Sequence, residues 1–408
     1  MSAPHSRAQW FHVTPAPADR NARVAVSVLF LTNGAMFTNL LPRYPEIKAA
    51  LETSNTVFGL SVAALPAGAL LSGLTAGAMI RRFGSARVAV LSSLLIGLFT
   101  FLAGLAPVAW VFALALFIAG AADALTDVAQ NAHARQVQRG YGRSIINSLH
   151  ALWSVGAVLG GAMGSAAIAL GVDIGVQLAI SGVVFGAMCL LSLRFLLPGP
   201  DRGQEPPAPA RGAEPGQRRR LVIYGMLAVL TVLVILDAAV EDAAQSWATL
   251  YLHDELGAPG AVAGLGFIAF AVCQFVGRVL GDRAVDRFGE RAVVRAGGLL
   301  TAVGMGLALT FPSVPATIAG FAVAGLGIAT VVPAAFHAAD NVPGLRPGTG
   351  LTVVTWLMRI GFLVSPPVVG AIADAASLRV GLSVIPFAGV VIVIAAAGLA
   401  GRVSGRNR

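Results

Sequence analysis

The stretch IRRFGSARVAV, residues 80–90, separates two long apolar runs, and VDRFGERAVVR, residues 285–295, separates two more. Both contain Arg-Phe-Gly, and their glycines, Gly84 and Gly289, lie 205 positions apart (289 minus 84). The same short basic turn, repeated in the same apolar setting, indicates that the chain contains a duplicated unit.

The apolar runs around these turns are long enough to cross a lipid bilayer. Hydrophobic residues make up 56% of the 408 residues and charged residues 12%, about half the charged share of a soluble globular protein. A helix needs about 20 residues to cross the hydrocarbon core. The sequence therefore predicts an all-α membrane protein with twelve transmembrane helices, near residues 24–42, 56–79, 88–107, 109–134, 145–171, 174–197, 221–249, 260–281, 293–311, 314–338, 348–373 and 379–401.

The basic residues predict the orientation. Of the 28 Lys and Arg residues, 24 fall in the two ends, the middle segment and alternate breaks, whereas the other side holds Arg43, Lys48 and Arg379. By the positive-inside rule, both termini are expected to be cytoplasmic. No cleavage pattern follows a short apolar region, so the first run is expected to be a retained helix. Abundant Arg, Ala and Gly beside a single Lys are typical of a bacterial genome rich in G and C, and we expect a multi-pass protein of the bacterial inner (plasma) membrane.

A segment rich in Pro, Gly and charge, residues 198–220, divides six runs from six and predicts a flexible linker. The expected organisation is a cytoplasmic leader 1–23, a six-helix bundle 24–197, the cytoplasmic linker 198–220, a second six-helix bundle 221–401 and a cytoplasmic tail 402–408. Two parallel six-helix halves with a substrate site between them at mid-depth are one architecture of secondary transporters.

Several other classes of protein lack support. The net charge of +9 is dispersed among apolar runs, which argues against a nucleic-acid partner. Cys189 and Cys273 lie inside apolar runs, so neither a disulfide framework nor a metal site is expected. There is no G-x-x-x-x-G-K-[ST] loop for a nucleotide, and no nucleophile–base set for an enzyme. We expect a monomer in the lipid bilayer with a small-molecule substrate, no cofactor, and the proton gradient as energy source.

Charged residues inside the spans mark candidate sites, because each costs roughly 2.5–3.5 kcal/mol at the bilayer centre unless it faces a cavity or a partner. Asp123, Asp127 and Asn131 are spaced i, i+4, i+8 and lie on one stripe of the fourth span. If one of these acids gains and loses a proton during transport, it couples solute movement to proton movement. The alternative is that one Asp forms a static ion pair with Arg359. In the seventh span, Glu241 is a candidate for an extracellular gate, a substrate hydroxyl acceptor or a proton site, and it is preferred over Asp242. The alternative is that Glu241 is only partly exposed to water at the outer mouth of the span.

Arg359 lies about eleven residues into the eleventh span and cannot lose its proton. It either pairs with Asp127, Asp123 or an acid of the seventh span, or binds an anionic substrate. The other pathway candidates are polar or aromatic: Asn33, Asn39, His150, Trp153, Trp247 and Trp356. The alternative for His150 is a solvated or capping residue near a helix end, and the alternative for Trp247 and Trp356 is anchoring at the membrane interface.

On these features the chain resembles the major facilitator superfamily. That family's signature between its second and third helices is a Gly, an acid, a basic residue, any residue, a Gly and further basic residues. The matching positions form a candidate gating loop: Gly77, Arg82, Gly84 and Arg87 in the first copy, with Arg81 where the family usually has Asp, and Arg278, Asp282, Asp286, Arg287 and Gly289 in the second. The resemblance implies that the first, fourth, seventh and tenth helices line a cavity and the third, sixth, ninth and twelfth face lipid. The central stretches of these last four spans carry no charge.

A finer resemblance is to the fucose permease-like branch. DVAQN, residues 127–131, is similar to the acidic-x-Ala-x-Asn element of its proton-coupled sugar symporters, with Asp127 and Asn131 at the matching positions. Those symporters also carry an acid in the first helix, where this chain has only Asn33 and Asn39. The resemblance implies proton-coupled uptake of a sugar-like or organic-acid solute. Two alternative functions remain: proton-driven efflux of drugs or metabolites, and a membrane sensor built on a transporter fold.

Overall fold

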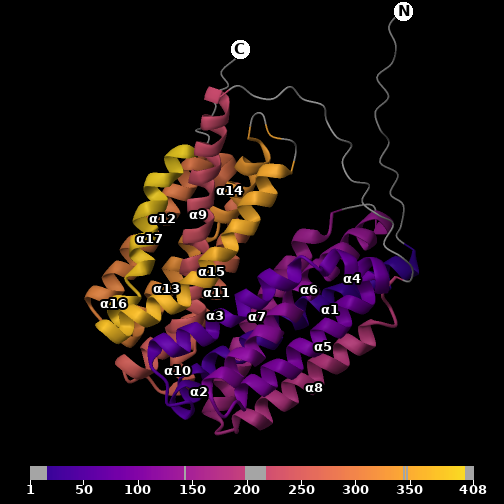
Figure 1. Ribbon diagram of the computed structural model, residues 1–408, viewed down its shortest axis with the longest axis horizontal. Coiled ribbons are helices and arrows are strands. Elements are labelled where there is room, and N and C mark those ends of the chain that lie inside the picture. The colour runs from indigo at the N-terminus through magenta and orange to yellow at the C-terminus, as the bar shows by residue number, and fades with distance from the viewer. Residues whose placement is uncertain (1–15, 142–143, 198–216, 343–344, 346–347, 400–408) are drawn as a thin grey trace, which may run out of the picture.

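The structure, a computed structural model, describes residues 16–141, 144–197, 217–342, 345 and 348–399. These residues contain twelve helical segments long and apolar enough to cross a membrane, and no strand occurs among them. The prediction of an all-α membrane protein with twelve spans is confirmed. The helices form two bundles, one from each half of the chain, that lie side by side (Figure 1).

The N-terminal bundle has six spans. α1 and the short helices after it form the first, α3 the second, α5 the third, α6 the fourth, α7 the fifth and α8 the sixth. Their bounds are α1 Pro17–Thr38, η1 Leu41–Arg43, α2 Tyr44–Ala50, α3 Asn55–Gly73, α4 Ala76–Phe83, α5 Ser85–Gly104, α6 Ala109–Tyr141, α7 Ile146–Ala169 and α8 Ile174–Ser192.

The C-terminal bundle repeats this order. The seventh span is α9 with a π-helical turn at its end, the eighth is α10 with α11, the ninth is α12, the tenth is α13 with α14, the eleventh is α15, and the twelfth is α16 with α17. Their bounds are α9 Gln217–Leu250, η2 Tyr251–Glu255, α10 Gly260–Ala263, α11 Leu265–Phe288, α12 Glu290–Thr310, α13 Val314–Ile328, α14 Val331–Asp340, α15 Thr349–Ala375, α16 Leu378–Gly381, α17 Val384–Ala395 and η3 Ala396–Gly398.

Some helices extend beyond the apolar runs that predicted them. α1 begins at Pro17, inside the expected leader 1–23, because a proline in the first turn and an acid such as Asp19 both suit a helix start. α6 continues to Tyr141, through a break predicted at 135–143. Residues 1–15 of the leader, 198–216 of the linker and the tail 402–408 lie outside the described residues, and α9 begins at Gln217.

The repeated turn consists of a single glycine in each half. Gly84 ends α4 and precedes α5 with φ 82° and ψ 147°, and Gly289 ends α11 and precedes α12 with φ 84° and ψ 152°. This region of φ and ψ is accessible almost only to glycine. Because only one glycine separates the helices, most residues of the predicted gating loop lie in helices. Arg287, for example, lies in the last turn of α11, where a positive charge suits the helix C-terminus.

The third, sixth, ninth and twelfth spans present apolar side chains outward. Exposed leucines, valines and other large hydrophobic residues follow one another along α5, α8, α12 and α17, for example Leu95, Val183, Val303 and Val390. In a membrane protein such a surface contacts lipid tails. This agrees with the expectation for these four spans.

The two halves contact each other at one end, which we call the closed end. It consists of Lys48, Asn55, Thr56 and Phe58 of the first half and Trp247, Asp254 and Asp374 of the second. Lys48 Nζ lies 3.4 Å from Asp254 Oδ2, and the Asp374 carboxylate accepts the backbone N–H groups of Asn55 (2.9 Å) and Thr56 (2.8 Å). The rings of Phe58 and Trp247 pack edge to face, with centroids 6.1 Å apart. The bundles diverge toward the opposite end, where α1 and α9 begin (Figure 1).

Candidate functional site

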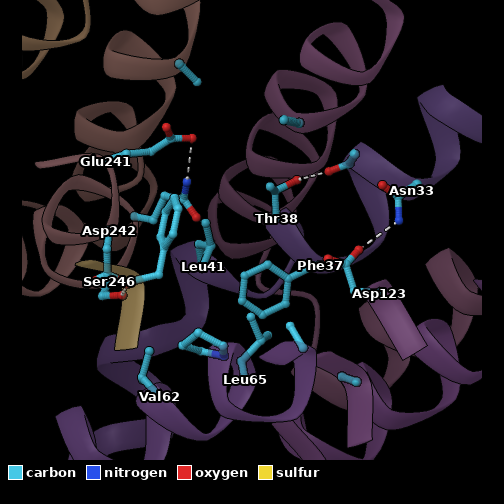
Figure 2. Close-up of a pocket in the computed structure, with 18 of the residues that line it drawn as sticks. Asn33, Phe37, Thr38, Leu41, Val62, Leu65, Asp123, Glu241, Asp242 and Ser246 are labelled. Atoms are coloured by element: carbon cyan, nitrogen blue, oxygen red, sulfur yellow. Dashed lines mark hydrogen bonds between the residues drawn. The ribbon is translucent and has the colours of Figure 1, made fainter. Parts of the chain in front are cut away.

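A cavity of about 310 Å³ lies between the two halves. The first half contributes side chains from the first five spans, and the second contributes them from α9, α11 and α15. Most of the wall is apolar or aromatic, and a few polar and charged groups point into it. Figure 2 shows Asn33 and Asp123 on one wall and Glu241 and Asp242 on the other. A mostly apolar cavity with a few convergent polar groups is the usual form of a small-molecule site.

Asn33 joins two predicted residues on the N-terminal wall. Its amide nitrogen donates to Asp123 Oδ1 at 2.9 Å, and its amide oxygen accepts from Trp153 Nε1 at 2.8 Å. Three helices, α1, α6 and α7, are thereby connected. Because only one Asp123 oxygen takes part in this bond, the other remains available to a ligand in the cavity.

Asp127 lies one turn further along α6 and also lines the cavity. Asn131 Nδ2 donates to Asp127 Oδ1 at 2.8 Å, and Asn131 Oδ1 lies 3.2 Å from His150 Nε2. The predicted stripe of Asp123, Asp127 and Asn131 therefore exists, and His150 of α7 extends it. The chain of side chains runs from the cavity toward the end where α1 begins.

Glu241 has several partners on the C-terminal wall. Gln274 and Gln245 donate to its two oxygens at 3.1 Å and 3.3 Å. Arg278 Nη2 lies 3.8 Å from Glu241 Oε2. Arg278 was predicted as part of the gating loop; the structure places it beside this acid, so part of the Glu241 charge is compensated within its own half.

Arg359 reaches across the cavity from the second half to the first. Its Nη1 donates to the backbone oxygen of Ala69 in α3 at 3.0 Å, and Gly73 leaves room for the guanidinium. Among the described residues, no carboxylate lies within 4.0 Å of it. Its charge nevertheless acts on both Asp123 and Asp127. A direct ion pair, one of the two expectations, is not formed in this conformation, and most N–H groups of Arg359 stay available.

The two copies of the repeated turn make equivalent contacts. Arg82 stacks over the Phe83 ring at 5.5 Å and Arg287 over the Phe288 ring at 5.4 Å. The residue after each glycine meets a histidine of the fourth or tenth span: Ser85 Oγ lies 2.9 Å from His133 Nδ1, and Glu290 Oε1 lies 2.5 Å from His337 Nδ1. The duplication that the sequence predicted is therefore visible in side-chain contacts as well as in helix order.

Comparison with known proteins gives the family. The model of the Major Facilitator Superfamily matches residues 26–241 and 227–406. The chain belongs to this superfamily. It is 31% identical over 382 residues to the membrane protein MosC of Rhizobium meliloti, which covers 93% of this chain and 90% of MosC.

Two solved structures show the same fold. The nucleoside transporter NupG has a TM-score of 0.73 at 13% identity and covers 94% of this chain and 98% of its own. A D-xylose-proton symporter has a TM-score of 0.69 at 18% identity and covers 93% of this chain and 96% of its own. At such identities the likeness concerns the fold alone.

The superfamily resemblance predicted that the first, fourth, seventh and tenth spans line the cavity. The first three do, but none of the lining residues comes from α13 or α14 of the tenth span. α14 instead packs against α9 and α15, and its Val331, Ala334 and Ala335 are buried there. The second, fifth, eighth and eleventh spans supply most of the remaining wall, including Trp153, Gln274 and Arg359. Ile96 of the third span, which was expected to face lipid, also lines the cavity.

Five predicted pathway residues do not line the cavity. Asn131 and His150 continue from Asp127, and the other three lie elsewhere. Trp247 is fully buried against Phe58, Trp356 is exposed on the outside of α15, and Asn39 is buried between helices, where it donates to Ser181 and accepts from Gln177. A polar or aromatic residue in a span satisfies the same sequence criterion whether it faces a cavity, a neighbouring helix or lipid. That is why the sequence could not separate these cases.

Many cavity residues were absent from the predicted site, and three of them are polar side chains with a bearing on its chemistry. Tyr44, Asp242 and Gln274 all line the wall. Gln274 carried a usable signal, since an amide inside an apolar run needs a partner. Asp242 was ranked below Glu241 because it lies about 100° further around the helix, but the cavity is wide enough to include both.

Proposed function

We propose that this protein is a secondary active transporter that moves a small polar solute across the bacterial inner membrane by alternating access, with both termini cytoplasmic. The observation that carries the proposal is the acid pair Asp123 and Asp127 in a cavity that both halves share and that is closed at one end. Rocking of the halves would expose these acids to one side of the membrane and then to the other.

Coupling to protons follows from the chemistry of such acids. A carboxyl that faces water in one state and a dry wall in the other changes its proton occupancy between them. Asp127, with its path through Asn131 and His150, is the proposed coupling group, and Asp123 with Asn33 and Trp153 is proposed to contact the solute. Arg359 and the Glu241 cluster shape the opposite wall.

A hydroxylated, sugar-like solute fits the wall best. Aromatic rings from Phe37, Trp153 and Phe270 line the cavity and can stack on the apolar face of a sugar, while carboxylates accept its hydroxyls. Two of the solved structures with this fold are a nucleoside transporter and a D-xylose-proton symporter, which is consistent with such a solute, as is the resemblance of residues 127–131 to the fucose permease-like branch. Uptake is the proposed direction.

The test records internal pH in proteoliposomes while neutral sugars, sugar acids and amphipathic cations are added one at a time. One class of solute is expected to carry protons inward, and Asp127→Asn is expected to abolish proton movement. Glu52→Gln, at an exposed acid between α2 and α3, is the matched control and should keep it. Protons that leave while a cation is taken up would favour efflux by antiport, and flux without protons in the unaltered protein would refute coupling.

A further inference from the structure

Two buried polar atoms in the cavity wall have no hydrogen-bond partner among the residues that the structure describes, and they come from opposite halves. Tyr44 Oη belongs to the first residue of α2, and Asp242 Oδ2 belongs to α9. Tyr44 is 1% exposed and Asp242 is 7% exposed. Both side chains line the cavity, and the charge of Asp242 acts on Tyr44.

The other oxygen of Asp242 is only modestly supported. Ser246 Oγ donates to Asp242 Oδ1 at 3.2 Å. The hydroxyl of Ser365 donates to the backbone oxygen of Ala239 at 3.1 Å and also interacts with the Asp242 carboxyl. A carboxylate ion with one unpartnered oxygen is costly to bury, and a neutral acid costs much less. This site is therefore suited to a carboxyl that carries a proton.

Asp242 lies near the closed end of the cavity. Trp247, one turn later in α9, packs on Phe58 of the other half, and the contacts of Lys48 with Asp254 and of Asp374 with α3 hold the two halves together there. Separation of the halves at this end would move Tyr44 away from Asp242 and let water reach the carboxyl. Opening would thus change the surroundings of Asp242 more than those of Glu241, whose partners all belong to its own half.

The charged neighbours of Asp242 leave it uncompensated. Tyr44 lines the same cavity from α2, and Glu241, next to Asp242 on α9, acts on it as a like charge. Arg278 of α11 is held by Glu241, and Arg359 of α15 donates to Ala69. Asp123 and Asp127 line the same cavity from α6. Among the described residues, no cation lies within 4.0 Å of Asp242.

From this arrangement we infer that Asp242 is a proton-binding site of the closed end: its carboxyl is protonated while the contact between the halves keeps it buried, and it releases the proton to water when the halves separate. The inference rests on the proposed function, since it requires alternating access. It differs from the proposed roles of Asp123 and Asp127, because it assigns a protonation step to the gate in the second half.

The experiment measures the distance between the halves at the closed end and needs no knowledge of the solute. Spin labels are placed at Ala49→Cys and Ala376→Cys, two exposed positions in different halves, in a chain whose Cys189 and Cys273 are changed to Ser. Distance distributions are recorded in lipid nanodiscs from about pH 5 to about pH 9, a range that brackets the titration of buried carboxyls. A longer-distance population is expected to grow as the pH rises.

Asp242→Asn removes the ionisable group and keeps its size, so the short distance should persist at every pH. Asp242→Glu should restore a pH-dependent shift, which excludes a folding defect at this position, and Asp173→Asn, at an acid that caps α8 outside the cavity wall, should retain the shift. A shift that survives in Asp242→Asn overturns the inference and leaves alternating access intact. A single distance at every pH in the unaltered protein also overturns it, and solute flux in proteoliposomes then tests the proposed function separately.

Discussion

At the scale of single residues, the two glycines of the repeated turn are the clearest case of sequence dictating structure. Gly84 and Gly289 share φ values of 82° and 84°, and a side chain there costs about 1–3 kcal/mol. Gly289→Ala is expected to lower the thermal unfolding temperature in detergent. Gly225→Ala is the control, because Gly225 lies in helix α9, where an added Cβ would meet no described atom within 4 Å beyond its chain neighbours and the nearby backbone of the same helix, and alanine is favoured in a helix. Equal unfolding temperatures for the two variants would contradict this account.

The site residues show where sequence reasoning succeeds at this scale and where it stops. Asp123, Asp127, Glu241 and Arg359 were predictable because a charge in a span must face a cavity or a partner, and all four line the cavity. Their pairing was not predictable. That Asn33 lies between Asp123 and Trp153 depends on how α1, α6 and α7 pack, which no local pattern encodes.

At the scale of helices, the spans followed from apolar length, but their ends did not, since charged residues extend a helix when they suit its termini. The contact between α15 and α3 also involves a charged residue that suits a helix end. Asp374, near the end of α15, accepts two N–H groups in the first turn of α3, and a carboxylate in this position stabilises a helix N-terminus by about 1 kcal/mol.

Because this contact joins the two halves, Asp374→Asn is expected to increase the population with a long distance between labels at residues 49 and 376. Asp173→Asn is the matched control, since Asp173 caps α8 within one half through Gly175 at 2.7 Å. It should leave the distance distribution unchanged. An unaltered distribution in Asp374→Asn would show that this cap does not hold the closed end.

At the scale of the whole molecule, the duplicated turn predicted two similar six-helix halves, and the structure has them. The tenth span is the exception: the resemblance placed it in the cavity wall, but α14 is buried against α9 and α15. Which spans line the cavity depends on the relative tilt of the halves in one conformation. That tilt results from contacts between the halves, such as Lys48 with Asp254, which are remote in the sequence and carry no periodic signal.

Alternating access is the central claim, and locking the closed end tests it most directly. Lys48→Cys and Asp254→Cys, in a chain without Cys189 and Cys273, would be joined by a short, reducible bifunctional thiol reagent, and uptake into proteoliposomes would be measured for the solute found in the pH experiment. Cross-linking is expected to abolish uptake and reduction to restore it, while Lys48→Cys alone, treated in the same way, keeps its uptake. Unchanged uptake after complete cross-linking would contradict the account, because the solute would then cross without the halves separating at this end.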